Sequence, residues 1–227
     1  MKVKELHRWD IAPKEAVALQ QRLRERLVFR ELQKTPKLIA GVDVSYEKHG
    51  DLFHAAIVIL SFPGLEVIEE SCASGRVDFP YIPGLLSFRE GPVVIEAFKE
   101  LKTVPDLAIF DGQGIAHPRG IGIASHIGLF LDIPTIGCAK TRLVGEYNEP
   151  GIDKGEFATL VYHGLEVGTV LRTRKGVKPV FVSSGHLVTI EESRELVLGC
   201  STKYRLPEAT RRAHILSNKI RIESQSP

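Results

Sequence analysis

The sequence predicts an α/β fold in which a mixed sheet is flanked by helices. Strand-like apolar segments separated by short turns follow one another over residues 37–77, an order typical of a three-stranded antiparallel meander. Helical and strand-like periodicities then alternate over residues 85–138, which favours parallel strands joined by helices. A second group of strand-like segments over residues 157–182 predicts an added β-hairpin.

Each element of the first part has its own local signal. Apolar residues recur at helical spacing over 13–33, and Pro13 suits the first turn of that helix. Side chains alternate between two faces over 37–46, and apolar runs bounded by turn residues follow at 51–62 and 65–77. We therefore expect one helix and then three strands in this part of the chain.

Helices and strands alternate in the remainder. The expected helices are 85–102, 121–131, 189–198 and 207–220, and the expected strands are 106–110, 134–138, 157–162, 165–172 and 179–182. The tripeptide Glu90-Gly91-Pro92 is expected to interrupt the first of these helices. Because Glu90 falls at that break, its carboxylate need not follow the solvent face of a regular helix.

The composition fits one globular domain over residues 1–227, with 43% hydrophobic and 26% charged residues. Three widely spaced cysteines without a C-x-x-C pair exclude a zinc knuckle or a disulfide framework and predict reduced thiols in a cytoplasmic protein. No apolar run reaches membrane-spanning length, so we expect no membrane partner. The net charge of +2 does not by itself indicate a polyanionic partner, but basic runs at 172–178 and 203–221 either are solvated faces or flank a nucleic-acid groove.

The stretch Asp111-Gly112-Gln113-Gly114 lies between an expected strand and an expected helix. This order puts Asp111 at the carboxyl end of a strand, where open α/β sheets bind their ligands. The glycines allow the backbone to approach a ligand closely, and an acid beside bare N–H groups suits a metal ion and a phosphate or base edge. The alternative is a turn in which Asp111 only bonds local N–H groups.

Asp43 lies in the middle of an expected strand, on a face that begins with the apolar Ile39. A charge there needs a partner or a metal, unless the strand is an edge strand whose Asp reaches solvent. His214 lies on the polar side of the last expected helix, roughly 130° from the middle of its apolar stripe. An acidic set made of Asp43, Glu90 and Asp111, without cysteine, favours magnesium or manganese over zinc.

A loop with prolines on both sides of Tyr81-Ile82 follows the third strand. The prolines stiffen the loop, and a bulky, rigid loop tip can insert between stacked bases. The alternative is a loop whose Tyr81 packs back onto the core.

Taken together, these segments resemble the endonuclease V family of inosine-directed repair nucleases. The matching motifs occur in one order along nearly the whole chain and are His7-Arg8-Trp9-Asp10, Gly41-Val42-Asp43-Val44-Ser45, Pro80-Tyr81-Ile82-Pro83-Gly84, Phe88-Arg89-Glu90-Gly91-Pro92, Asp111-Gly112-Gln113-Gly114, His117-Pro118-Arg119, Gly137-Cys138-Ala139-Lys140 and Thr210-Arg211-Arg212-Ala213-His214. The resemblance implies a ribonuclease H-like mixed sheet, with three antiparallel strands and then parallel strands.

The resemblance also implies an activity. The enzyme would use magnesium, with manganese as a substitute, to hydrolyse the second phosphodiester bond 3′ to deoxyinosine, leaving a 3′-hydroxyl and a 5′-phosphate. Asp43 and Asp111 would hold the metal directly, Glu90 would complete the site, and His214 would help to place or activate water. Its partner would be single- or double-stranded DNA containing deoxyinosine, with inosine RNA a second candidate, and the enzyme would be a monomer.

The same resemblance assigns substrate contacts. Pro80, Tyr81, Ile82 and Pro83 would form a strand-separating wedge, with Tyr81 at its tip. His117 and Lys140 would contact phosphate. The base pocket would be lined largely by backbone, at Gly84, Leu86, Gly112, Gly122, Ile123 and Gly137.

Two other functions remain open from the sequence. A different nuclease of the same fold class, such as a junction resolvase or a ribonuclease H-type enzyme, would share the acidic set, although the wedge loop argues against it. A non-catalytic nucleic-acid-binding domain would have no cleavage to lose when Asp43 is replaced, although the complete acidic set argues against that.

Overall fold

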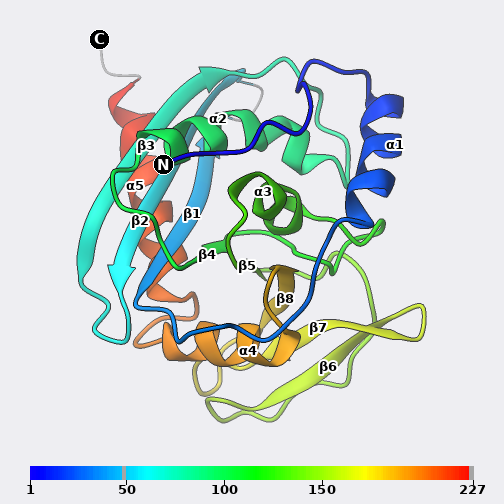
Figure 1. Ribbon diagram of the computed structural model, residues 1–227. Helices are drawn as coiled ribbons and strands as arrows, with labels where there is room; N and C mark the ends of the chain where they lie inside the picture. The colour runs from blue at the N-terminus through cyan, green and yellow to red at the C-terminus, as the bar shows by residue number, and fades with distance from the viewer. Residues whose placement is uncertain (48–49, 225–227) are drawn as a thin grey trace.

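The computed structural model describes residues 1–47 and 50–224, which form one eight-stranded sheet covered by helices (Figure 1). The strands are β1 (Leu38–Tyr46), β2 (Leu52–Ser61), β3 (Val67–Arg76), β4 (Leu107–Phe110), β5 (Thr135–Ala139), β6 (Phe157–Tyr162), β7 (Leu165–Leu171) and β8 (Val180–His186). The helices are α1 (Pro13–Arg24), α2 (Leu86–Glu100), α3 (Ile123–Leu131), α4 (Ile190–Gly199) and α5 (Glu208–Glu223).

The sheet is mixed, and its strand order is β3-β2-β1-β4-β5-β8-β7-β6. Strands β1, β2 and β3 form the predicted antiparallel meander, and β4 and β5 add to β1 in parallel. The predicted hairpin β6–β7 joins the same sheet through β8, which pairs antiparallel with both β5 and β7. The predicted fold class is therefore confirmed.

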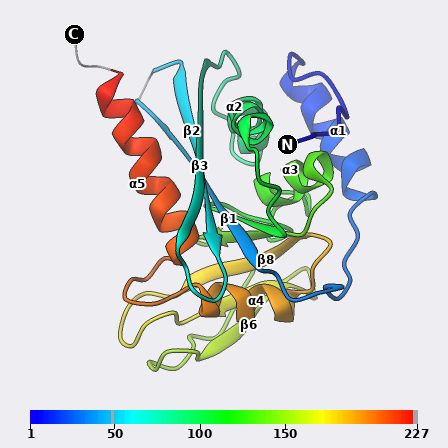
Figure 2. The ribbon, with the colours of Figure 1, turned by 60° about the vertical axis from the view of Figure 1, so that its left-hand side comes forward.

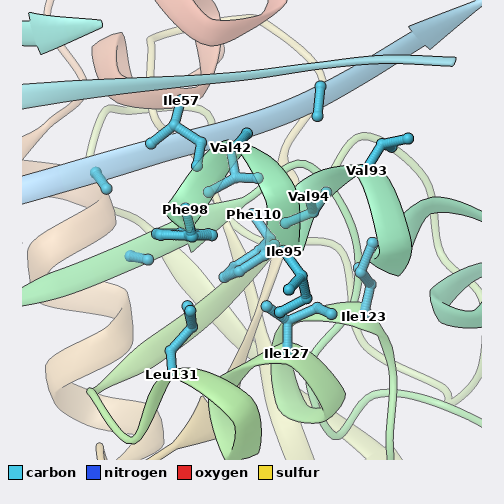
Figure 3. Close-up of a cluster of buried hydrophobic side chains, with 14 of the residues drawn as sticks. Val42, Ile57, Val93, Val94, Ile95, Phe98, Phe110, Ile123, Ile127 and Leu131 are labelled. Atoms are coloured by element: carbon cyan, nitrogen blue, oxygen red, sulfur yellow. The ribbon is translucent and has the colours of Figure 1, made fainter. Parts of the chain in front are cut away.

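Helices cover both faces of the sheet. Figure 2 shows α5 on one side of the meander and α1, α2 and α3 on the other. Side chains alternate between the two faces of β1, so that Val42 packs under α2 and α3 while Ile39 packs on the side of α5. The cluster under α2 and α3 includes Phe98 and Phe110 (Figure 3).

The first helix is shorter than predicted, because it ends at Arg24 and not near residue 33. The following segment is extended, and its backbone is bound to distant side chains. Val28 N donates to Nδ1 of His186 at 3.2 Å, and Leu32 N donates to Glu192 Oε1 at 2.8 Å. These long-range hydrogen bonds stabilise an extended course that helical periodicity alone does not reveal.

The predicted interruption of the second helix at Glu90-Gly91-Pro92 is wrong, because α2 runs through it without a break. Pro92 leaves the Phe88 carbonyl without its helical donor, but packing keeps the helix intact. Gly91 contributes to that packing: a Cβ there would lie 2.6 Å from Cη2 of Trp9, so the glycine lets the Trp9 ring lie against the helix.

The other elements agree with the sequence within a few residues. Strand β8 continues past the predicted residue 182 to His186, because it keeps pairing with β5 up to Thr135. The predicted reduced thiols are free, with Cys138 and Cys200 buried and Cys72 exposed. Among the described residues, none of the helices combines the length and apolar character needed to cross a bilayer.

Candidate active site

Asp43 is held between β1 and α5. A Cβ on Gly41 would lie 2.0 Å from the backbone carbonyl carbon of Ala209, so this glycine lets α5 pack directly on the strand. The next residue on the same face is Asp43, which therefore meets α5 one to two turns further along. Ser217 Oγ donates to Asp43 Oδ2 at 2.6 Å, and Nδ1 of His214 lies 3.2 Å from the same oxygen.

Asp43 is not the solvent-reaching acid of an edge strand. Strand β1 lies between β2 and β4 in the sheet, and the Asp43 residue is only 7% exposed. The predicted need for a partner is met by the hydroxyl and the imidazole of α5.

Asp111 lies beside Asp43 because β1 and β4 are parallel neighbours. Val42 pairs with Phe110 in the register, and the next residue of each strand is one of the two acids. Asp111 N donates to the Val42 carbonyl at 3.0 Å, which ties the end of β4 to β1. Asp43, Asp111 and His214 each offer one ligand atom, and these atoms lie within 4.8 Å of one another.

Glu90 reaches the same region from α2 but lies outside that three-residue group. It is 8% exposed, and its pKa is raised well above the ordinary value by burial and by the negative charges of Asp43 and Asp111. Its side chain points inward because α2 is a regular helix here, and not because the helix is broken. The structure thus brings the three predicted acids to one region, in which Asp43 and Glu90 are buried and Asp111 is half-buried.

Burial disfavours the charged forms of Asp43 and Glu90. Burial raises the pKa of Asp43 to about 6, the Ser217 hydrogen bond opposes this rise, and the Asp111 charge adds to it. Lys140 Nζ lies 2.5 Å from Asp111 Oδ2 and offsets part of the charge. A cluster of carboxylate oxygens with one imidazole is a donor set that suits a hard divalent cation.

The predicted wedge loop lies between β3 and α2. Tyr81 is 65% exposed at its tip, so it does not pack back onto the core, and Pro80 and Pro83 are exposed as well. Ile82 is half-buried against the cluster that contains Phe88, which anchors the loop.

The guanidinium of Arg89 supports the wedge loop from α2. Its Cζ lies 5.8 Å from the ring centroid of Tyr81, 5.2 Å from that of Tyr46 and 5.0 Å from that of Phe53. Arg89, which precedes the buried Glu90, therefore contacts the Tyr81 ring at the loop tip.

A cavity of about 130 Å³ lies under this loop. Its lining includes four of the six residues predicted for the base pocket, together with the loop tip and several polar side chains. The lining residues are Gln20, Tyr81, Ile82, Pro83, Gly84, Leu86, Ser87, Gln113, His117, Gly122, Ile123 and Leu143.

Gly112 and Gly137, the other two predicted pocket residues, are not among those that line the cavity. A Cβ on Gly137 would lie 2.2 Å from Gly114 N, and one on Gly112 would lie 2.6 Å from Cγ2 of Ile123. These glycines allow the turn after β4 to pack against β5 and α3. The sequence analysis inferred that glycines let the backbone approach a ligand closely. At Gly112 and Gly137 the close approach is to other segments of the protein.

The predicted phosphate contacts lie in different surroundings. Lys140 is at the end of β5 beside Asp111, whereas His117 is buried in the cavity wall. His117 Nε2 donates to the Gly84 carbonyl at 3.0 Å, and burial together with the Arg119 charge lowers the pKa of His117 to about 4. His117 is therefore a neutral side chain that holds the loop at Gly84, whose φ is +81°.

Gln113 and Ser217 were missed by the sequence analysis. Gln113 Nε2 donates to the Thr141 carbonyl at 3.0 Å, so its Oε1 must be the acceptor atom. This Oε1 is buried and has no hydrogen-bond partner among the described residues. Ser217 could have been found, because it follows His214 by three residues and so lies on the same side of the helix.

The mixed sheet, with one acid within β1, another directly after β4 and an imidazole from α5, defines a nuclease of the ribonuclease H-like class. Residues 21–215 match the family model described as Endonuclease V. An Endonuclease V of Dictyoglomus thermophilum is 51% identical over 90% of this chain and 89% of its own. The chain therefore belongs to the endonuclease V family, and it is a hydrolase that cleaves phosphodiester bonds in DNA.

Solved structures agree with this assignment. The crystal structure of Endonuclease V from Streptomyces avermitilis is 42% identical, covers 100% of both chains and superposes with a TM-score of 0.92. Endonuclease V of Ciona intestinalis is 27% identical over 93% of this chain and 98% of its own, with a TM-score of 0.83. That structure is a complex with a 24mer DNA containing an inosine followed by a ribo-adenosine.

Proposed function

We propose that this nuclease recognises deoxyinosine in DNA and, with magnesium, hydrolyses the second phosphodiester bond on its 3′ side. The products are a 3′-hydroxyl and a 5′-phosphate, and the role is repair of deaminated adenine. One observation carries the proposal: the same elements supply both the acids and the cavity. Helix α2 contributes Glu90 and Leu86, and the turn after β4 contributes Asp111 and Gln113.

The metal site in this proposal consists of Asp43 and Asp111, with Glu90 behind them and His214 at the open side. Magnesium or manganese held by these carboxylates would supply Lewis acidity, which lowers the pKa of water and offsets negative charge on the phosphodiester. Ser217 fixes the orientation of the Asp43 carboxylate, and Lys140 orients that of Asp111. The side chain of His214 is 46% exposed, so its ring can place a water beside the attacked phosphate.

The cavity receives the damaged base in this proposal. The inosine nucleotide rotates out of the base stack, and its base enters the cavity under the loop. The Tyr81 ring fills the gap that the base leaves in the stack. Hypoxanthine carries a ring N–H at N1, where adenine has only a lone pair. The buried Oε1 of Gln113 is an acceptor without a donor, and a base with that N–H supplies one.

The decisive experiment uses labelled 30-mer strands that are identical except for one inosine or adenine. With magnesium we expect one nick in the inosine strand, single- or double-stranded, and none with chelator or with adenine. Inosine RNA strands tested in parallel measure the preference for DNA. Cleavage of four-way junctions or RNA–DNA hybrids without any dependence on inosine would overturn the proposal and identify another nuclease of this class.

A further inference from the structure

An exposed aromatic ring and a half-buried guanidinium form a pair at the start of α5, in a region that the proposed function does not use. Tyr204, in the loop between α4 and α5, is 49% exposed. The Cζ of Arg211 lies 4.3 Å from the centroid of its ring, within the range of a cation–π contact. We refer to Tyr204 and Arg211 as the Tyr204 platform.

A buried carboxylate fixes the orientation of this platform. Arg211 Nη2 donates to Glu208 Oε2 at 2.7 Å, and Arg211 Nε lies 3.2 Å from both carboxylate oxygens. Glu208 is buried and also accepts a hydrogen bond from Thr202 Oγ1 at 3.1 Å. The guanidinium is therefore positioned before any ligand arrives, which lowers the entropic cost of binding on the ring.

Two connections tie the platform to the acids. Arg211 and His214 are three residues apart on α5, so their side chains are neighbours on one side of the helix, and His214 contacts Asp43. Arg205, which follows Tyr204, donates to the Lys140 carbonyl at 2.6 Å, and Lys140 contacts Asp111. The platform is thus linked to Asp43 through α5 and to Asp111 through Lys140.

The charge around the platform suits a polyanion. Lys203, Arg205, Arg211 and Arg212 lie within ten residues, and Glu208 is the acid among them. An exposed aromatic ring among cations is the combination with which proteins bind single-stranded nucleic acid, where bases stack on the ring and cations neutralise phosphates.

We propose that Tyr204, backed by Arg211, stacks on a base of the cleaved strand outside the inosine cavity. This contact holds the strand at a second place, in addition to the Tyr81 loop. The inference rests on the proposed function, because it takes the substrate to be a strand that carries inosine.

Crosslinking tests the contact without cleavage. We use inosine strands in which 5-iodouracil replaces one base at a time, bound to the full-length enzyme in chelator, and map crosslinked peptides by mass spectrometry. We expect one window of positions to crosslink at Tyr204. Crosslinks at other sites only, on a strand that still binds, would overturn the proposal.

Affinity provides a second, quantitative test. Stacking on one aromatic ring is worth enough that Tyr204→Ala should weaken binding of a long inosine strand about tenfold, whereas Tyr204→Phe keeps the affinity. Strands shortened until they no longer reach the crosslinking window should bind Tyr204→Ala and the wild type equally. Equal affinity of both proteins for the long strand would contradict the inference.

Phe157 is a matched control, because its exposed ring also lies on a half-buried guanidinium, with Arg194 Cζ 4.0 Å from the ring centroid. It sits on β6, five strands from β1, or roughly 24 Å at the usual strand spacing. Phe157→Ala should leave binding unchanged. If the wild type cuts inosine strands but Tyr204→Ala binds them as tightly as Phe157→Ala does, the platform is refuted and the proposed function stands. If the wild type does not cut inosine strands, the proposed function fails.

Discussion

Ser217 Oγ donates a 2.6 Å hydrogen bond to Oδ2 of Asp43, so a residue of the last helix orients an acid of the first strand. We expect Ser217→Ala to lower kcat/KM about tenfold or more, because a hydrogen bond to a charged group is worth ~1.5–3 kcal/mol. This bond also lowers the pKa of Asp43, so its loss should move the acidic limb of the pH–rate profile to higher pH. An unchanged profile would contradict a positioning role.

Asp43→Asn should abolish cleavage without unfolding the protein. The carboxylate is buried beside Asp111, and its replacement removes a repulsion as well as a ligand of the proposed metal site. Cleavage assays and thermal melts in chelator test both parts, with the exposed Asp153→Asn as the control. Loss of folding in Asp43→Asn would show that the acid is structural.

The stability of the metal-free enzyme should fall as the pH rises through the range set by Asp43. Its pKa is 3.8 in the unfolded reference and about 6 in the folded protein, so the folded state binds the proton more tightly. The contribution of Asp43 to the free energy of unfolding is therefore greatest below about pH 4 and is lost by about pH 7. Urea titrations between these values should give a flatter pH dependence for Asp43→Asn than for the wild type.

Magnesium and manganese should raise the melting temperature by binding to the folded state. The rise should be larger at pH 7.5 than at pH 5.5, because a protonated Asp43 competes with the cation. Asp111→Asn should abolish the rise. An equal rise in the variant would place the cation elsewhere.

Tyr81→Ala should weaken binding to inosine strands while leaving the melting temperature unchanged, because the ring is exposed. Tyr81→Phe should bind normally, since a wedge uses the ring and not the hydroxyl. Anisotropy titrations in chelator measure the affinity. Normal binding and cutting by Tyr81→Ala would contradict the proposal that Tyr81 acts as a strand-separating wedge.

Gly41→Ala should destabilise the fold by about 1–3 kcal/mol or more, because its Cβ would lie 2.0 Å from the Ala209 backbone. Gly64→Ala is the control, since its Cβ would only approach the side chain of Ser61, at 3.1 Å. Urea unfolding compares the two. Equal stability would mean that α5 does not pack on β1 as described.

The sequence was most informative where one residue conflicts with its local pattern. Asp43 interrupts the apolar face of a strand, so the alternation of side chains along that strand identified it. Asp111 was identified from its place between a strand and a glycine-rich turn. The antiparallel meander and the parallel strands after it were predicted as well, but the sequence left open whether the strand of Asp43 lies at an edge, and only the structure places β1 between β2 and β4.

Features that depend on distant packing were not predictable in this way. The extended course after Arg24 depends on His186 and Glu192, which lie far along the chain. Likewise, Gly137 is informative only once the backbone of Gly114 is known to lie against it. Local periodicity contains neither relationship.

Helix α2 carries the cavity residue Leu86, the guanidinium that supports the loop, and the buried acid Glu90 within five consecutive residues. Under the proposed function, a mutation that tilts or shifts this helix alters base recognition and cutting rate together. Under the same proposal, a change in α2 that admits other bases also moves Glu90 relative to Asp43 and Asp111.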